Sequence, residues 1–286
     1  MKNTPSPQGR LSRLFDKKHQ QIRFKYRLLT AKSRVLPDFL ILGARYSGTA
    51  SLIKLINEHP KLHGTCQSQI HYFDGGLFPE KDNFSKGEHW YRAHFPMRKE
   101  MPNGHQAFEA STFYSFHPLA AKRLHSLIPK VKIIFVLRNP VDRAIHHYLD
   151  SKRHNREYLP FINALQIEEK RLAWTLKNKD YKSGTFIHAT YKSRGHYQEQ
   201  IERYLKLFPK EQIKLVSIEE LKRAPNKVLL DVYRFLGVEN IDMRIDSIHL
   251  PQAELEQEPE VRSYLKNYFS KRNQAFYEFS GKSFNW

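Results

Sequence analysis

Cysteine is nearly absent from this sequence of 286 residues, which contains only Cys66. A single thiol forms neither an internal disulfide nor a thiolate zinc site, so the sequence implies no oxidising compartment. We expect Cys66 to act as a small hydrophobic residue beside the end of a strand. Glycine and proline are also sparse, with 12 and 15 residues, which excludes collagen-like and low-complexity classes.

Long hydrophobic runs are absent as well. The longest, such as residues 133–137, are far shorter than the ~20 residues that cross a bilayer. The N-terminal residues lack the apolar core of a signal peptide. With 40% hydrophobic and 27% charged residues, the composition is that of an ordinary globular protein, and we predict a cytoplasmic location with membrane association left open.

Negative charge is scarce, because 29 Asp and Glu face 48 Lys and Arg and the formal net charge is +19. Residues 1–36 hold ten of the basic residues against Asp16 alone, and so supply +9 of this excess. Apolar residues recur there at roughly helical spacing: Leu11, Leu14, Phe15, Ile22, Tyr26 and Leu29. Two interpretations stay open, a basic amphipathic helix that contacts an anionic membrane or polyanion, and a solvated, partly helical tail. The remaining +10 favours an anionic substrate or cofactor.

Short apolar strands alternate with helices from about residue 37 onward. The pattern predicts strands at 39–43, 131–137 and 213–216, and helices at 48–58, from 140, at 195–208 and at 225–236. We therefore predict an α/β fold, with the basic segment 1–36 followed by a single domain, 37–286, built on a P-loop-like, mostly parallel sheet flanked by helices. Residues 63–110 and 150–194 break the alternation, and we expect loops and helices there over the carboxyl ends of the strands.

A glycine-spaced turn, GARYSGT at 43–49, follows the first predicted strand and opens a helix. Backbone N–H groups and the positive helix end converge at such a turn, which makes it an anion cradle. The lysine that a nucleotide triphosphatase carries before the hydroxyl residue is missing, since Gly48 is followed directly by Thr49. A tight turn that binds no ligand is the alternative interpretation.

Two arginines stand where the strand at 131–137 passes into its helix. Arg138 follows the strand directly, and Arg143 lies in the first turns of the helix. Because a guanidinium group suits bidentate phosphate binding, we predict that Arg138 binds an anionic ligand. For Arg143 we favour an ion pair within its own helix.

Seven segments in order carry a family resemblance. They are FLILGARYSGTASLIKLINEHP from Phe39, IHYFD at 70–74, HWYRAHF at 89–95, EASTFY at 109–114, IIFVLRNPVDRAIHHY at 133–148, RGHYQEQIERYLKLFPKEQ at 194–212 and the tail SKRNQAFYEFSGKSFNW. The chain resembles the sulfotransferase superfamily, which uses 3′-phosphoadenosine 5′-phosphosulfate (PAPS). The resemblance is nearest to the heparan-sulfate-type and bacterial carbohydrate sulfotransferases.

This resemblance implies an enzyme that transfers sulfate from PAPS to a hydroxyl or amine of a glycan or small molecule. We predict no metal, because the histidines lack the spacing of metal ligands. It implies that the first loop binds the 5′-phosphosulfate and that Arg138 binds the 3′-phosphate. His146 stands at the position of a family serine, and we expect it to donate a hydrogen bond to a phosphate. The loop residues assigned to the donor are Arg45, Tyr46, Ser47, Gly48, Thr49 and Ala50.

Besides His146, two residues of the family pattern are replaced. The family has a lysine or arginine that contacts the leaving phosphate where this chain has Tyr46, and a glutamate base where it has Gln69. We hypothesise that Arg45 or a distant basic residue replaces the cation. His71, oriented by Asp74, would replace the base, since histidine is a sound base near neutral pH.

The acceptor is predicted to be anionic or sugar-like and to contact Gln69 and Glu109. For Glu109 the alternative is a buried partner of an arginine. The basic stretch that the family has before its C-terminal helix finds no clear counterpart in 247–252. Two other functions remain as alternatives, a sulfotransferase-fold binding protein without catalysis and, ranked last, a nucleic-acid-binding protein, for which the sequence shows no motif.

Overall fold

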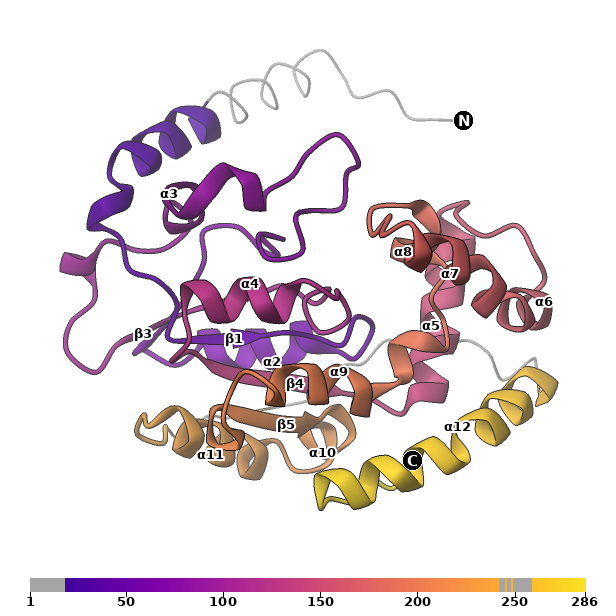
Figure 1. Ribbon diagram of the computed structural model, residues 1–286. Helices are drawn as coiled ribbons and strands as arrows, with labels where there is room; N and C mark the ends of the chain where they lie inside the picture. The colour runs from indigo at the N-terminus through magenta and orange to yellow at the C-terminus, as the bar shows by residue number, and fades with distance from the viewer. Residues whose placement is uncertain (1–18, 242–244, 246–247, 249–258) are drawn as a thin grey trace, which may run out of the picture.

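The computed structural model describes residues 19–241, 245, 248 and 259–286 (Figure 1). Its described strands form one parallel sheet in the order β2-β3-β1-β4-β5. They are β1 (Phe39–Ile41), β2 (Leu62–Gly64), β3 (Gln106–Ala110), β4 (Lys132–Leu137) and β5 (Ile213–Ser217). In the central strand, Leu40 lies opposite Glu109 on one side and Ile133 on the other. All of these strands end at the same edge, where open parallel sheets bind ligands.

Helices cover both faces of the sheet, because successive side chains of a strand point to opposite sides. In β4, Ile133 and Phe135 share a hydrophobic core with α4 (Ala120–Leu127) and α9 (Tyr197–Leu205). Ile134 and Val136 share the opposite core with α2 (Thr49–Asn57), α10 (Ile218–Arg223) and α11 (Pro225–Leu236). The predicted α/β fold with a parallel sheet flanked by helices is confirmed.

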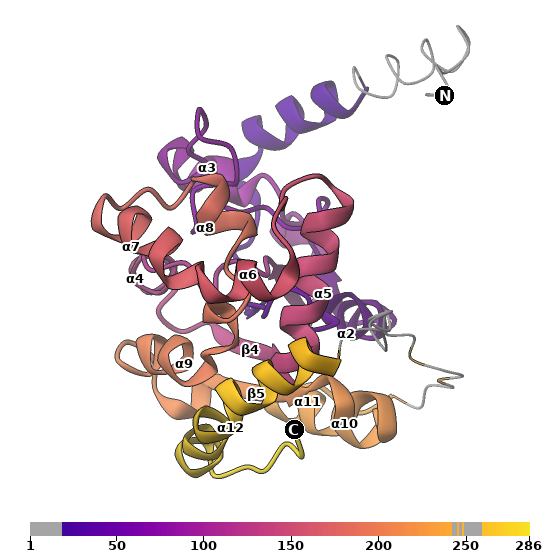
Figure 2. The same ribbon diagram turned by 90° about the vertical axis from the view of Figure 1, so that its right-hand side faces the viewer.

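A group of helices stands at the carboxyl edge of the sheet (Figure 2). α5 (Pro140–Arg153) begins directly after β4, and α6 (Phe161–Gln166), α7 (Glu168–Lys177) and α8 (Gly184–His188) follow it. Ile145 of α5 shares a core with Phe161 of α6 and with Phe269 of α12 (Pro259–Ser280). The expectation of helices at 150–194 is therefore confirmed.

The expectation that 63–110 holds only loops and helices is wrong, because β3 and most of β2 lie there together with α3 (Gly87–Arg92). Glu109 interrupts the apolar pattern of β3, and β2 is very short and carries the polar His63. The helix predicted at 195–208 is shorter in the structure, since the single turn η4 (Ser193–Gly195) precedes α9. Cys66 is exposed, so the prediction of a small hydrophobic role for it is wrong as well.

The described part of the basic N-terminal segment is helical over residues 19–29 and continues into the single turn η1 (Ala31–Ser33). Residues 1–18 lie outside the described residues, and so does most of the segment 247–252. In the described chain, no helix combines the length and apolar character needed to cross a bilayer.

Candidate active site

The loop between β1 and α2 is shaped as an anion cradle. Gly43 has a φ of 113°, and a Cβ there would lie 2.4 Å from the carbonyl oxygen of Thr112, so only glycine fits. Gly48, with a φ of 74°, precedes α2, and no side-chain hydrogen bond caps this helix end, whose partial positive charge favours an anion. Of the other residues assigned to the donor, Ser47 and Thr49 are buried and Ala50 is exposed.

Tyr46 ties this loop to α5. Its hydroxyl donates to Oδ2 of Asp150 at 2.6 Å, and its ring stacks on His147 with the ring centroids 4.7 Å apart. Burial, reinforced by the hydrogen bond to Asp150, raises the pKa of Tyr46 to about 12. The hydroxyl is thus protonated at neutral pH and acts as a donor. Tyr46 supplies no charge to the loop, where the family pattern has a cation.

Two guanidinium groups meet beside the loop at one carbonyl oxygen. Arg45 Nη1 donates to the oxygen of Ile187 at 3.3 Å, and Arg194 Nη2 donates to the same atom at 3.0 Å. Burial and the neighbouring Arg45 cation hold the pKa of Arg194 well below its usual range. Nη1 of Arg194 is buried without a hydrogen-bond partner among the described residues. A buried guanidinium group with an unpaired N–H favours an anionic ligand.

Arg138 lies at the end of β4 and is only 6% exposed. Its Nη1 donates to the carbonyl oxygen of Tyr46 and to Nδ1 of His146, each at 3.2 Å. A guanidinium group has donors only, so Nδ1 of His146 accepts and the ring proton sits on Nε2. Burial and the Arg138 cation lower the pKa of His146, which is consistent with this neutral form. Nε2 is then the atom from which His146 can donate to a phosphate.

His71 and Asp74 form a hydrogen-bonded pair in the segment after β2. Nδ1 of His71 lies 2.6 Å from Oδ2 of Asp74, whose other oxygen accepts from the backbone N–H of Gly76 at 2.9 Å. The Asp74 side chain is fully buried, whereas that of His71 is 13% exposed. The carboxylate holds a proton on Nδ1 and leaves Nε2 as a proton acceptor. This hydrogen bond has the geometry that the predicted orientation of His71 by Asp74 requires.

Ser111 and Thr112, which follow β3, lie between this pair and the loop. Ser111 Oγ accepts from the backbone N–H of His71 at 3.1 Å. Thr112 Oγ1 donates to Oε1 of the exposed Gln69 at 2.9 Å, and the Thr112 carbonyl lies against Gly43. The loop, Gln69 and the His71–Asp74 pair are thereby brought to one edge of the sheet.

Glu109 fits neither of its two interpretations. It is fully buried, and its oxygens accept from three hydroxyl groups, those of Tyr91 (2.6 Å), Ser111 and Tyr114 (2.8 Å). Burial raises the pKa of this carboxyl. An acceptor cannot reach it, and hydroxyl groups rather than an arginine satisfy it, because β3 directs the side chain into the aromatic core.

The family model of the sulfotransferase domain matches residues 36–276. The chain belongs to the sulfotransferase family. A solved sulfotransferase from Alicyclobacillus acidocaldarius is 30% identical, with a TM-score of 0.67 over 87% of this chain and 97% of that one. Heparan sulfate glucosamine 3-O-sulfotransferase 5 of Mus musculus is 28% identical over 88% of this chain and 74% of the relative. Membrane-associated sulfotransferase kil1 of Dictyostelium discoideum is 24% identical over 88% of this chain and 66% of its own length.

The prediction for Arg143 of this sulfotransferase is wrong. Its guanidinium group is fully buried and donates to the carbonyl of Tyr191, while Nε and Nη1 have no hydrogen-bond partner among the described residues. The neighbouring Asp142 pairs with Arg262 of α12 at 2.7 Å instead. Arg143 therefore adds a further buried cation near Tyr46 and Arg138.

The sequence did not predict that His147 and Asp150 of α5 contact Tyr46 of the loop. His147 is fully buried, its ring nitrogens have no partner in the described chain, and burial followed by the Arg194 cation holds its pKa well below the usual range. The available signal was helical spacing, because Arg143, His147 and Asp150 fall on one face of the helix that Arg138 precedes.

Proposed function

We propose that this chain transfers a sulfuryl group from PAPS to a hydroxyl or amine of an anionic, glycan-type acceptor. The observation that carries the proposal is the hydrogen-bonded His71–Asp74 pair, held at the same sheet edge as a phosphate loop. Family membership and relatives named as heparan sulfate sulfotransferases support it.

The residues around the loop fit a polyanionic donor. Arg143 and Arg194 bury N–H groups that lack partners in the described chain, and the uncapped end of α2 adds partial positive charge. We assign the 5′-phosphosulfate to the loop with Arg45 and the 3′-phosphate to Arg138 and His146. The bound donor supplies the sulfuryl group, whose bond to the 5′-phosphate oxygen breaks as the acceptor oxygen or nitrogen bonds to sulfur.

The proton that the acceptor loses goes to Nε2 of His71 in this proposal. Asp74 fixes the tautomer and stabilises the imidazolium that forms, because its buried carboxylate lies 2.6 Å from Nδ1. Gln69 cannot take a proton, but its exposed amide is held by Thr112 and can donate a hydrogen bond to the acceptor. His71 is thus assigned the role of base and Gln69 a binding role.

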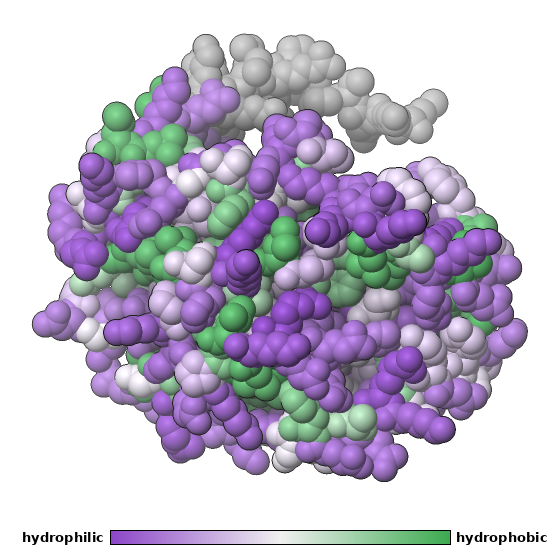
Figure 3. All heavy atoms as spheres, in the orientation of Figure 1, coloured by the Kyte–Doolittle hydropathy of each residue, from purple (hydrophilic) through white to green (hydrophobic). Residues whose placement is uncertain are grey.

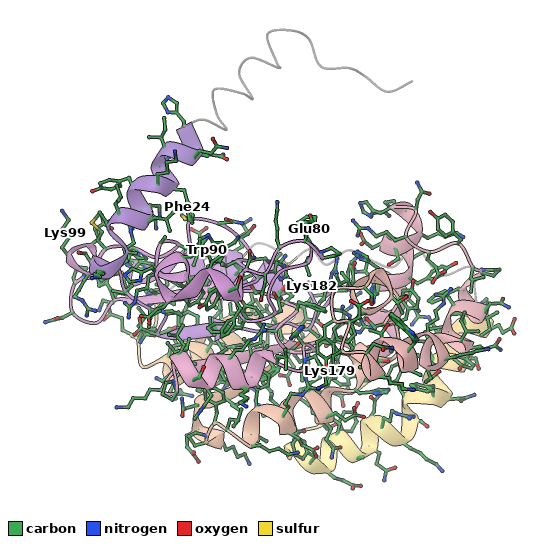
Figure 4. The ribbon with its side chains drawn as sticks, turned by 45° about the horizontal axis from the view of Figure 1, so that its top comes forward. Phe24, Glu80, Trp90, Lys99, Lys179 and Lys182 are labelled. Carbon is green, nitrogen blue, oxygen red and sulfur yellow. The ribbon has the colours of Figure 1, made fainter. Side chains whose placement is uncertain are left out.

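The rim near His71 carries charges of both signs. Asn83 donates to the carbonyl oxygens of Ile70 and His71, each at 3.1 Å, and so fixes the loop 75–83 beside the pair. Lys182, on the segment before α8, donates to the carbonyl of Lys81 in this loop, and Lys179 lies nearby on the same segment (Figure 4). Glu80 and Asp82 of the loop and Asp180 beside Lys179 offset these lysines, so the anionic character of the acceptor is proposed from the net charge of +10 on residues 37–286. Contact of segment 1–36 with a membrane or polyanion and a cytoplasmic location remain predictions.

Turnover and product binding test the proposal together. The full chain is assayed with radiolabelled PAPS and heparan sulfate, and titrated calorimetrically with 3′-phosphoadenosine 5′-phosphate at moderate salt, which suppresses nonspecific binding. We expect His71→Ala to lower turnover by about 10²–10⁴-fold because the base is lost, with product binding unchanged. We expect Arg138→Ala to abolish product binding.

Matched controls are His89→Ala and Arg234→Ala, since both side chains are exposed on helices away from the loop. Full turnover by His71→Ala would end the assignment of the base. Product binding without turnover on any glycan would favour the binding-protein alternative. Absence of product binding would overturn the proposed function.

A further inference from the structure

A hydrophobic stripe runs along the N-terminal helix, residues 19–29. Its members are Ile22, Tyr26 and Leu29, which are 66%, 57% and 86% exposed. Their spacing of four and three residues places them on one face of the helix. Figure 3 shows hydrophobic surface on this helix, at the upper left. The outer face of a helix packed on a globular body is ordinarily polar, so this stripe is expected to have a partner.

The opposite face of the helix is already occupied by the body of the protein. The ring of Phe24 lies 4.9 Å from that of His94 and 6.3 Å from that of Trp90 (Figure 4). Arg27 donates from Nε to the carbonyl oxygen of Ala93 at 2.5 Å and from Nη2 to that of Phe95 at 2.6 Å. The helix is thus fixed by one face, and the stripe faces away from the body.

Positive charge accompanies the stripe. Arg23 and Lys25 on the helix and Lys32 in η1 are all exposed. Residues 19–36 contain no aspartate or glutamate, so no neighbour along the chain neutralises these cations. The partner of this face must therefore accept apolar side chains and carry negative charge. An anionic lipid surface combines both properties, whereas a soluble glycan or nucleic acid would leave the stripe in water.

We propose that helix 19–29 lies in the interface of an anionic membrane. Ile22, Tyr26 and Leu29 enter the boundary between headgroups and acyl chains, and the flanking cations contact lipid phosphates. Because the opposite face is docked, the membrane holds the catalytic body itself and not a separate tail. A stripe of three residues gives reversible attachment that depends on lipid charge and on salt.

Vesicle sedimentation of the full chain tests this proposal. We expect wild type to bind vesicles of phosphatidylcholine with phosphatidylserine, to bind vesicles of phosphatidylcholine alone far more weakly, and to be released by salt. The variant Ile22→Ser/Leu29→Ser should lose more than tenfold in binding, because both apolar contacts are removed. Arg23→Glu/Lys25→Glu should lose at least as much, since each cation contributes about fivefold near an anionic surface.

Matched controls separate this helix from general effects of charge and hydrophobicity. Trp174→Ser/Leu176→Ser removes exposed apolar side chains from α7, and Lys266→Glu/Lys271→Glu removes exposed cations from α12. Both controls should bind vesicles as wild type does. Equal binding by the Ile22→Ser/Leu29→Ser variant and wild type overturns the proposal. A wild-type dimer that this variant converts to a monomer also overturns it, because the stripe would then have a protein partner.

Discussion

Tyr46 holds the loop between β1 and α2 in place, although it lacks the positive charge that the family pattern has at this position. The ring packs on His147 and the hydroxyl reaches Asp150, so the loop is joined to α5 by a neutral contact. In the proposed donor site the cations are assigned to Arg45, Arg143 and Arg194, none of which occupies the family position. A missing lysine in the motif is therefore weak evidence against donor binding in this chain.

Tyr46→Phe keeps the ring and removes its hydrogen bond. We expect the free energy of unfolding in urea to fall by about 1 kcal/mol, and product affinity to fall with it, because the loop loses its tie to α5. Tyr158→Phe is the control, since that side chain is 79% exposed. Unchanged stability and affinity in Tyr46→Phe would mean that the bond to Asp150 does not hold the loop.

The pairing of His71 with Asp74 could be predicted because both residues lie within one short segment of the chain. The surroundings of Arg143 could not, because they depend on how α5 is rotated against α12 and the segment before η4. Asp142 is the carboxylate next to Arg143 in the sequence, yet it forms its ion pair with Arg262. Local spacing predicts local pairs, and tertiary packing decides which side of a helix is buried.

At the scale of elements, the sequence predicts β1, β4 and β5 but not β2 and β3. β4 is apolar from Ile133 to Leu137, and its predicted and observed bounds agree closely. β3 buries Glu109 by surrounding it with three hydroxyl groups, two from Ser111 and Tyr114 directly after the strand and one from Tyr91 of α3. The sequence of β3 does not show that Glu109 has these partners. The charge of Glu109 therefore led to the prediction that no strand lies there.

Gly195 allows η4 to pack closely against α5 and α12. A Cβ at this position would lie 2.7 Å from Cζ of Phe269 and 2.9 Å from Cβ of Pro140. Gly195→Ala is therefore expected to lower the free energy of unfolding by about 1–3 kcal/mol through overpacking. Gly184→Ala is the control, because nothing lies within 4 Å of a Cβ there. Equal denaturation midpoints for the two variants would contradict this account of the contact.

For the whole molecule, buried histidines predict sensitivity to acid. Burial lowers the pKa to about 4 in each of four histidines, His94, His117, His188 and His196. In the unfolded chain these groups take up protons as the pH falls below about 6.5, whereas in the fold they stay neutral. Acid therefore lowers the free energy of unfolding. Each group contributes up to about 1.4 kcal/mol for every unit by which the fold lowers its pKa.

We expect the thermal midpoint to be highest above about pH 6.5 and to fall steadily toward pH 4. His117→Asn should reduce this slope, because one site of proton uptake is lost while the amide oxygen can still accept from Leu119 N–H. His89→Asn, at an exposed position, should leave the slope as it is. A flat midpoint across this range would contradict the prediction.

The attachment of the N-terminal helix has an evolutionary consequence. Arg27 and Arg34 both donate to main-chain oxygens after α3, including that of Phe95 at 2.6 and 2.8 Å. Every residue type offers a carbonyl, so substitutions at positions 93 and 95 leave these acceptors in place, provided the core still packs. Related sequences should accordingly retain both arginines while positions 93 and 95 vary. The residues on the two sides of this contact are therefore expected to change at different rates during evolution.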